Sequence, residues 1–301
     1  MNFDINNVPS QKGRVAIVTG ANIGLGFETT RALAQKDATV VMACRTEEKA
    51  LKAKAEILKE FPNAELHFIA LDLSSLTSVR EFANLFRAQF QQLDLLINNA
   101  GVMIPPYQKT QEGFELQLGT NYLAHFLLTS LLLDLLEKTE GSRIVSLASI
   151  AHKSGKIHFD DMQFEKRYSR MKAYQQSKLA CLIFSIELDR KLKANGYKTL
   201  SVAAHPGVST TNLMQYIPSW LLTLSTPIIK AMSHAPREGA QPQLYAALGD
   251  DIVGGDYTGP KGFQEMKGPA GKTKGMRHAY DEQTAQRLWD MSLELTGATF
   301  F

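Results

Sequence analysis

The chain has 301 residues and a formal net charge of +3 at pH 7. This length can bury a large core and fits a single α/β domain. So small a charge, with the basic residues scattered along the chain, argues against a nucleic-acid-binding protein. The two cysteines, Cys44 and Cys181, lack metal-type spacing. We expect them to be reduced core thiols of a cytoplasmic protein that has no metal site.

Neither the N-terminal segment nor the most apolar run of the chain suggests membrane insertion. Residues 1–11 are polar, lack the regions of a signal peptide and are expected to form an N-terminal extension. The most apolar run, residues 123–136, is interrupted by His125 and Asp134 and is too short to span a bilayer. We therefore expect no membrane anchor and read that run as a buried helix.

From Arg14 onward, apolar β-rich runs alternate with helical patterns. The predicted strands are Arg14–Thr19, Thr39–Ala43, Leu66–Leu71, Leu93–Ile97, Arg143–Leu147 and Thr199–Ala203. The predicted helices are Gly24–Gln35, Thr46–Glu60, Ser75–Phe90, Glu112–Lys138 and Met171–Leu192, with a further helical pattern at Asp281–Leu295. Strands that are apolar throughout, each followed by a helix, indicate a parallel sheet covered on both faces. The predicted fold is a doubly wound α/β sheet of the Rossmann type, forming a single domain over residues 1–301.

The first strand is followed by a glycine-rich turn, Thr19-Gly20-Ala21-Asn22-Ile23-Gly24-Leu25-Gly26. Glycines let the backbone turn tightly and approach a phosphate, and the next helix offers its N-terminal amides and dipole to a pyrophosphate. The spacing is G-x-x-x-G-x-G rather than the familiar G-x-G-x-x-G. A simple glycine-rich turn is the alternative, but the position between strand and helix favours a dinucleotide site.

The second strand ends at Cys44-Arg45-Thr46, where dinucleotide enzymes commonly place an acid for the adenosine ribose. The planar, charged guanidinium of Arg45 suits a 2′-phosphate instead. The alternative is an arginine that merely faces solvent at a loop start. NADP(H) is therefore favoured, and NAD(H) is not excluded.

The helix predicted at Met171–Leu192 carries Tyr174 and, four residues later, Lys178. Positions four apart share a helix face. A lysine ammonium about 5 Å from the phenol, at an effective dielectric near 20, would favour the phenolate by about 3 kcal/mol, roughly two pKa units. Such a pair alone is usually an ordinary pair of neighbours on a helix surface, so its meaning depends on the other motifs.

Four separated motifs together resemble the short-chain dehydrogenase/reductase family over residues 12–211. They are Thr19–Gly26, Asn98-Asn99-Ala100-Gly101, Ser149 and the Tyr174/Lys178 pair. Longer phrases resemble its retinol dehydrogenase-like branch: Phe164–Ser169, His205-Pro206-Gly207-Val208 and Ala235–Ala240. Ile23 departs from the family's usual small or polar residue, but no catalytic group is missing.

The resemblance implies four catalytic roles. Tyr174 would be the general acid/base between a carbonyl and an alcohol, and Lys178 would lower its pKa and bind the nicotinamide ribose. Ser149 would donate to the substrate oxygen, and Asn121 would hold a water of the proton relay. A strand-ending serine and a structural asparagine are the alternatives for the last two.

The resemblance also implies the cofactor contacts. Asp72 would meet the adenine ring, although it could equally be the start signal of the next helix. Asn98–Gly101 would lie beneath the adenine ribose, and Thr211 would contact the carboxamide or phosphates. The full expected set is Gly20, Asn22, Ile23, Gly24, Leu25, Gly26, Arg45, Asp72, Leu73, Asn99, Ala100, Gly101, Tyr174, Lys178, Pro206, Gly207 and Thr211.

The substrate is less clearly marked. In the family, the region corresponding to Asn212–Ser233 is a variable lid, and its apolar content here indicates a bulky hydrophobic carbonyl or alcohol. A helix pair packed on the core, or shallow membrane contact, are alternatives. Relatives often pair through helices, so Leu182–Phe184 could supply the face of a homodimer or homotetramer, or could be core. The tail from Gly254 carries no motif that we can interpret and is expected to pack beside the lid.

The sequence therefore predicts an NADP(H)-dependent oxidoreductase that interconverts a hydrophobic aldehyde or ketone and its alcohol. Two alternatives remain open. One is reduction of an activated C=C bond, as in the protochlorophyllide reductase relatives. The other is a non-catalytic NADP(H)-binding sensor, which would not need the acid/base group.

Overall fold

The computed structural model describes residues 3–208 and 234–301. Its strands are β1 (Val15–Thr19), β2 (Thr39–Cys44), β3 (Leu66–Ala70), β4 (Leu95–Asn98), β5 (Arg143–Leu147), β6 (Leu200–Ala204), β7 (Tyr257–Pro260) and β8 (Ala270–Thr273). They form one sheet in the order β3-β2-β1-β4-β5-β6-β7-β8. Every neighbouring pair is parallel except β7 and β8, which are antiparallel.

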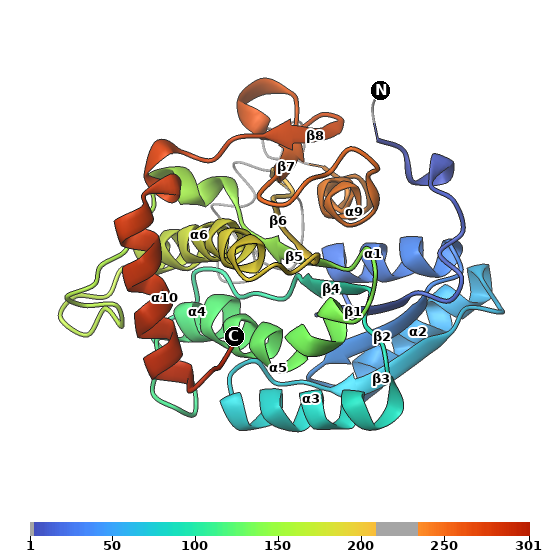
Figure 1. Ribbon diagram of the computed structural model, residues 1–301, viewed down its shortest axis with the longest axis horizontal. Helices are drawn as coiled ribbons and strands as arrows, with labels where there is room; N and C mark the ends of the chain where they lie inside the picture. Colours follow the sequence, from blue (N-terminus) through green and yellow to red (C-terminus); the bar gives the residue numbers. More distant parts are fainter. Residues whose placement is uncertain (1–2, 209–233) are drawn as a thin grey trace, which may run out of the picture.

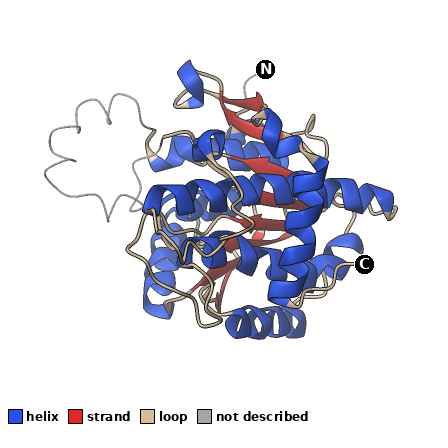
Figure 2. Cartoon of the chain, turned by 90° about the vertical axis from the view of Figure 1, so that its left-hand side faces the viewer, coloured by secondary structure: helices blue, strands red, loops and turns tan. Residues whose placement is uncertain are grey.

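Helices cover both faces of this sheet, as Figures 1 and 2 show. They are α1 (Gly24–Gln35), α2 (Glu47–Glu60), α3 (Leu76–Gln89), α4 (Leu116–Leu118), α5 (Ala124–Glu137), α6 (Arg170–Ala194), α8 (Pro236–Gly239), α9 (Gln241–Leu248) and α10 (Glu282–Thr296). The doubly wound α/β fold is confirmed. The six predicted strands are confirmed as well, with ends that differ by at most two residues.

Successive side chains of β1 point to opposite faces of the sheet, and helices cover both of these faces. Val15 and Ile17 belong to the hydrophobic core beneath α3, α5 and α6, whereas Ala16 and Val18 belong to the core beneath α1, α2 and α9. All four residues are buried. A strand whose two faces are both buried must be apolar throughout, which is the pattern that the sequence shows.

The long helix predicted at Glu112–Lys138 is wrong at its N-terminal end. Gly113 has a φ of +88°, and Glu115 is the N-cap residue of α4, its carboxylate accepting the amide hydrogen of Leu118. A π-helical segment, η2 (Gly119–Leu123), then leads into α5. π-Helical turns are rare and occur often at functional sites, and this one contains Asn121.

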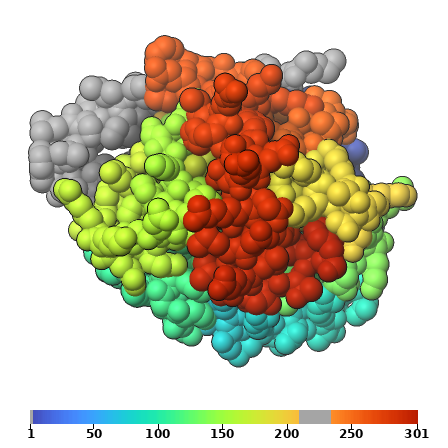
Figure 3. All heavy atoms as spheres, turned by 60° about the vertical axis from the view of Figure 1, so that its left-hand side comes forward, coloured from blue at the N-terminus to red at the C-terminus, as the bar shows by residue number. Residues whose placement is uncertain are grey.

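The sequence predicted only some of the C-terminal secondary structure. The helix predicted at Asp281–Leu295 is confirmed as α10, but β7, β8, α8 and α9 were not predicted. Helix α10 packs along α6 and α5, and Figure 3 shows it in red between neighbouring segments of the chain. Its Trp289 lies 5.1 Å from Phe126 and 4.6 Å from Phe300, measured between ring centroids.

This packing settles one open alternative. Leu182, Ile183 and Phe184 are buried, and the Phe184 ring is stacked on Trp289 of α10. The chain's own C-terminal helix therefore covers the face that could have joined two copies. These residues are core.

The N-terminal segment is attached to the domain rather than extended from it. Its 3-10 turn η1 (Ile5–Asn7) packs against α9, with Ile5 and Val8 buried. Cys44 and Cys181 are buried free thiols, as expected. Within the described ranges, no helix has the length and apolar character to cross a bilayer. Thr211 and the expected lid, Asn212–Ser233, lie outside the described residues.

Candidate active site

The glycine-rich turn between β1 and α1 fits a closely bound pyrophosphate. Gly20 and Gly24 have φ values of +68° and +58°, which favour glycine. A Cβ on Gly26 would lie 2.2 Å from the Gly20 carbonyl oxygen. The N-cap residue of α1, Ile23, makes no side-chain capping bond, so the amides and positive dipole end of this helix remain available to an anion.

The segment after β4 is held directly beneath this turn. The Thr19 hydroxyl oxygen accepts the amide hydrogens of Asn99 and Ala100, each at 2.9 Å. The side-chain Nδ2 of Asn99 donates in turn to the Thr19 carbonyl at 2.7 Å. A Cβ on Gly101 would lie 3.5 Å from the Lys178 Nζ. The segment expected beneath the adenine ribose thus runs from the glycine turn to the proposed catalytic lysine.

Ser149 and Tyr174 lie together, one after β5 and the other on α6. The Ser149 hydroxyl accepts the amide hydrogen of Ala151 at 3.2 Å. Burial raises the pKa of Tyr174 to about 12, and the Ser149 side chain opposes this shift. A hydroxyl that can donate its proton to a phenolate stabilises the phenolate, so Ser149 favours the ionised tyrosine.

Lys178 occupies the next turn of α6. Its Nζ donates to the Leu147 carbonyl of β5 at 2.7 Å, and burial lowers the pKa of the ammonium itself. Desolvation is the largest cause that acts on the pKa of Tyr174, and activation of the phenol by Lys178 stays a prediction.

Asn121 joins three segments around the site. Its Oδ1 accepts the amide hydrogen of Val102 at 2.7 Å, and its Nδ2 donates to Ser177 of α6 at 2.9 Å. Its carbonyl accepts from His125 Nδ1 at 3.0 Å and from the Cys181 thiol at 3.2 Å. The π-helical turn displays this residue toward α6, and the proposed relay water remains a prediction.

Sequence analysis missed the role of His125. Because its Nδ1 donates to the Asn121 carbonyl, its Nε2 is the acceptor for the Thr19 hydroxyl at 3.0 Å. Burial lowers the pKa of this histidine to about 4. A neutral His125 thus connects the glycine turn to the Asn121 segment, and an isolated histidine in an apolar helix gave no signal of that role.

Arg45 and Asp72 are the two residues expected to contact the adenosine half of the cofactor. Arg45 is exposed at the end of β2 and forms no hydrogen bond or ion pair with the residues at 3–208 and 234–301. Asp72 accepts the amide hydrogen of Ser74 at 2.9 Å and its hydroxyl at 2.7 Å, while Leu73 is buried. Asp72 therefore orders the turn before α3, and an adenine contact stays a prediction.

After β6, the chain turns through Pro206 and Gly207. Gly207 has a φ of +71°, and its amide donates to Nδ1 of His205 at 3.2 Å. The amide of Val208 donates to the Met266 carbonyl at 2.9 Å. This turn is thus fixed by contacts with the loop between β7 and β8, which the sequence did not indicate.

A second missed group holds the chain after Val102. Glu115 is fully buried and accepts from the Tyr168 hydroxyl at 3.1 Å. Gln117 accepts the amide hydrogen of Ile104 at 2.8 Å and donates to the same hydroxyl at 3.1 Å. In the sequence, Tyr168 belongs to the segment Phe164–Ser169, which resembles the retinol dehydrogenase-like branch. That resemblance was the only signal for this network.

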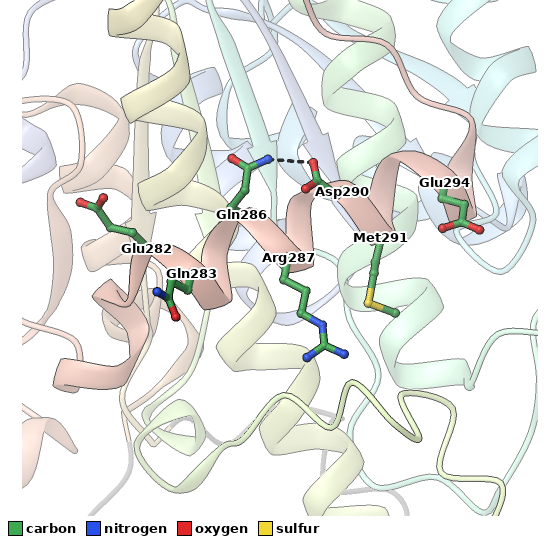
Figure 4. A pocket seen from close by; sticks show the side chains of 7 residues that line it. All are labelled: Glu282, Gln283, Gln286, Arg287, Asp290, Met291 and Glu294. Carbon is green, nitrogen blue, oxygen red and sulfur yellow. Dashed lines mark hydrogen bonds between the residues drawn. The ribbon is translucent and has the colours of Figure 1, made fainter.

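A shallow hollow of about 540 Å³ lies elsewhere, on the outer side of α10 (Figure 4). Its lining residues all come from that one helix: Glu282, Gln283, Gln286, Arg287, Asp290, Met291 and Glu294. None lies at a strand end or contacts the proposed catalytic groups. This hollow is surface relief and is not a substrate pocket.

Comparisons with known proteins identify the family of this chain. Residues 14–222 match the family model described as short chain dehydrogenase. Human retinol dehydrogenase 12 is 44% identical over 287 residues, covering 95% of this chain and 87% of the relative. Polyprenol dehydrogenase of Danio rerio is 39% identical, covering 98% and 90%.

A solved structure gives the same result for the fold. An uncharacterized protein from Mycobacterium Paratuberculosis is 38% identical, with a TM-score of 0.84 and full coverage of both chains. The family binds nicotinamide cofactors, and the glycine turn, the free helix terminus and the Asn98–Gly101 segment fit such a group. The chain belongs to the short-chain dehydrogenase/reductase family, in the branch that includes the retinol dehydrogenases.

Proposed function

We propose that this protein is an NADP(H)-dependent oxidoreductase that interconverts a hydrophobic aldehyde or ketone and its alcohol. The observation that carries the proposal is that Ser149 acts on the buried Tyr174, one helical turn from Lys178, whose Nζ would lie 3.5 Å from a Cβ on Gly101. A pure binding protein would need the glycine turn but would not need a buried acid/base pair next to it.

In the proposed reaction, each residue of the site has a separate role. A bound nicotinamide supplies or accepts the hydride. Tyr174 exchanges the proton with the substrate oxygen, and its raised pKa keeps it protonated, and therefore a competent acid, at neutral pH. Ser149 donates to the same oxygen as negative charge develops on it. Lys178 binds the ribose of the nicotinamide half, and Asn121 keeps the adjoining loop and α6 in register.

The substrate class rests on the relatives. Their names specify retinol and polyprenol, which are both long, apolar alcohols. We propose that this protein likewise takes an apolar alcohol or the corresponding carbonyl, with the region 212–233 as its lid. The two buried free thiols support a reducing compartment such as the cytoplasm. Assembly as a homodimer or homotetramer is also proposed, through a face other than Leu182–Phe184, with sedimentation velocity as its test.

The first experiment replaces Tyr174 with Phe. We expect the variant to lose about 1,000-fold in kcat on any carbonyl that the native protein reduces, because positioned proton transfer contributes about 10²–10⁴-fold. Tyr197→Phe, a change of the same size away from the site, should keep native turnover. Unchanged turnover in Tyr174→Phe would rule out the acid/base assignment.

A substrate panel separates the proposed activity from its competitors. Aldehydes, ketones, retinoids and enones are incubated with reduced cofactor, and absorbance is followed at the nicotinamide band. Consumption with aldehydes and ketones supports the proposal. Turnover confined to enones would indicate reduction of C=C bonds, and cofactor binding without turnover would indicate a sensor.

Cofactor choice has a separate test at Arg45. Its exposed guanidinium at the end of β2 supports a contact with the 2′-phosphate. Arg45→Ala should weaken NADPH binding by about 10- to 100-fold, the value of a charge-assisted contact, and should leave NADH binding unchanged. Lys59→Ala, which removes the same charge at the far end of α2, is the control. Equal binding of both cofactors by the native protein would contradict the preference.

A further inference from the structure

The loop between β7 and β8 lies directly against the turn after β6. The amide of Val208 donates to the Met266 carbonyl at 2.9 Å. A Cβ on Gly207 would lie 2.3 Å from that same carbonyl oxygen. The two backbones therefore touch with no side chain between them, and the conformation of the Pro206–Gly207 turn depends on the loop at 261–268.

His205 connects this turn to the loop with one defined tautomer. The ring is fully buried, and a Cβ on Gly259 would lie 2.0 Å from its Nε2. Its Nδ1 accepts the Gly207 amide hydrogen at 3.2 Å. Burial lowers the pKa of His205, so the ring is neutral at neutral pH. A neutral ring that accepts at Nδ1 carries its proton on Nε2.

That Nε2 faces Glu265. The distance from Nε2 to the Glu265 Oε2 is 3.4 Å, a close polar contact, and neither atom has an aligned hydrogen-bond partner among the described residues. The same Oε2 lies 2.9 Å from the Lys153 Nζ, and the other oxygen accepts from the Thr273 hydroxyl. These three partners hold the pKa of the Glu265 carboxyl well below its usual range, so the group is ionised.

Lys153 extends the connection to the catalytic serine. It belongs to the 3-10 turn η3 (Ile150–Ser154), whose N-cap residue is Ser149. Glu265 therefore contacts the two turns that flank the proposed nicotinamide site, one through His205 and the other through Lys153.

The backbone at Glu265 is itself unusual. Gln264 and Glu265 have φ values of +48° and +60°, in the left-handed region that side chains avoid. Such conformations cost on the order of 1–3 kcal/mol and persist only where their surroundings fix them. The strain is located at the residue that makes these connections.

We propose that Glu265 is a positioning residue with two arms. Through His205 it fixes the Pro206–Gly207 turn, so that the nicotinamide half of the cofactor is held in register, and through Lys153 it fixes the turn that carries Ser149, so that this hydroxyl is held against the substrate oxygen. The chain of contacts runs from the carboxylate to Nε2–H, and from Nδ1 to the Gly207 amide. A neighbouring carboxylate makes the imidazole a stronger acceptor at Nδ1. This inference rests on the proposed function, since it assumes a nicotinamide cofactor.

The test compares Glu265→Gln with Glu294→Gln, the same chemical change on the exposed side of α10. Binding is measured by fluorescence titration with two probes, NADPH and adenosine 2′,5′-bisphosphate, which lacks the nicotinamide half. We expect Glu265→Gln to weaken NADPH binding by about tenfold and to leave adenosine 2′,5′-bisphosphate binding within about twofold of native. Glu294→Gln should change neither.

The outcomes separate this inference from the proposed function. If the native protein binds neither probe, the proposed function fails. If it binds both and Glu265→Gln matches it, or if both probes weaken equally, the positioning role is overturned.

A second measurement needs no cofactor. Nitrogen-15 NMR of the unliganded protein should show His205 protonated on Nε2, and Glu265→Gln should shift that resonance. A histidine protonated on Nδ1 would overturn the chain of contacts. Lys153→Met tests the other arm, and should lower kcat about tenfold while NADPH affinity stays near native. Loss of NADPH affinity instead would contradict the division between the two arms.

Discussion

Two regions of this molecule carry function in different ways. At the ends of β1, β4 and β5, the residues proposed to act stand in their own short motifs: the glycine turn, Asn98–Gly101 and Ser149. The C-terminal region at 234–301 contains none of the proposed catalytic residues. It contributes instead a helix, α10, that covers α6, and a hairpin loop that contacts the turn after β6.

Substitutions in the two regions should therefore have different effects. A change at a strand end alters a group that is proposed to touch cofactor or substrate, so we expect little effect on folding. A change in the C-terminal region removes support from groups elsewhere, so its main effect falls on stability or on positioning. The predictions below test whether the two kinds of effect separate.

The largest expected effect is on stability, from Trp289→Ala. Trp289 is buried between Phe126, Phe184 and Phe300. Removing a buried aromatic side chain costs about 3–5 kcal/mol, so the midpoint of guanidinium unfolding should fall sharply. Leu85→Ala, at an exposed position, should change stability by less than about 0.5 kcal/mol.

The second measurement on Trp289→Ala is of its enzymatic activity. Where Trp289→Ala is still folded, its kcat and cofactor affinity should match the native values, since α10 touches neither the glycine turn nor Ser149. A folded variant with much lower kcat would show that α10 acts directly on the site and would remove the distinction between the regions.

The strands and turns of the first region could be predicted from the sequence because their signals are local. Apolar strands, the Gly20–Gly26 spacing and the pair Tyr174/Lys178 can each be read from a few adjacent residues. The structure places these groups together because the carboxyl ends of neighbouring parallel strands meet at one edge of the sheet.

The second region could not be read in the same way. Glu265 gains its meaning from His205 and Lys153, which lie 60 and 112 positions earlier in the printed sequence. The pKa of Tyr174 depends on burial, which the spacing of Tyr174 and Lys178 does not reveal. Contacts between distant segments and the depth of a side chain are properties of the folded chain, so local patterns do not encode them.

The next effect lies at the junction of the two regions, at His152. Its Nδ1 bonds to the Ser149 carbonyl at 2.6 Å, and its Nε2 accepts from the Met276 amide at 3.3 Å. Burial lowers its pKa from 6.5 to about 4. Between these values the unfolded chain binds a proton that the folded chain excludes, so stability falls as pH falls from 6.5 to 4.

The full size of that loss is about 3 kcal/mol, at about 1.4 kcal/mol per pKa unit. Guanidinium unfolding at pH 7 and pH 4.5 measures it. His152→Gln should show a smaller difference between the two pH values than the native protein, whereas the exposed His67→Gln should not. An unchanged pH dependence in His152→Gln would mean that this ring is protonated in the folded state.

Gly26→Ala addresses the first region and should weaken cofactor binding. The added Cβ would lie 2.2 Å from the Gly20 carbonyl oxygen, so the turn must shift. We expect NADPH binding to weaken by about 100-fold, roughly 2.7 kcal/mol. Gly141→Ala, at a φ of +70° but with open space around it, should cost about 1 kcal/mol of stability and leave binding intact. Native affinity in Gly26→Ala would contradict the assigned pyrophosphate site.

The smallest effect comes from the N-cap of α10. The Asp281 carboxylate accepts the amide hydrogen of Thr284 at 2.8 Å, and losing such a cap costs about 1 kcal/mol. Thermal unfolding of Asp281→Ala should show a midpoint about 2 °C lower, and Asp290→Ala, inside the same helix, should show less. Because α10 packs on α5, α6 and η2, whereas the β7–β8 loop contacts the turn after β6, NADPH affinity should be unchanged in both variants. A weaker affinity in Asp281→Ala would show that the start of α10 transmits to the cofactor turn, so that the C-terminal region acts as one unit rather than as two separate supports.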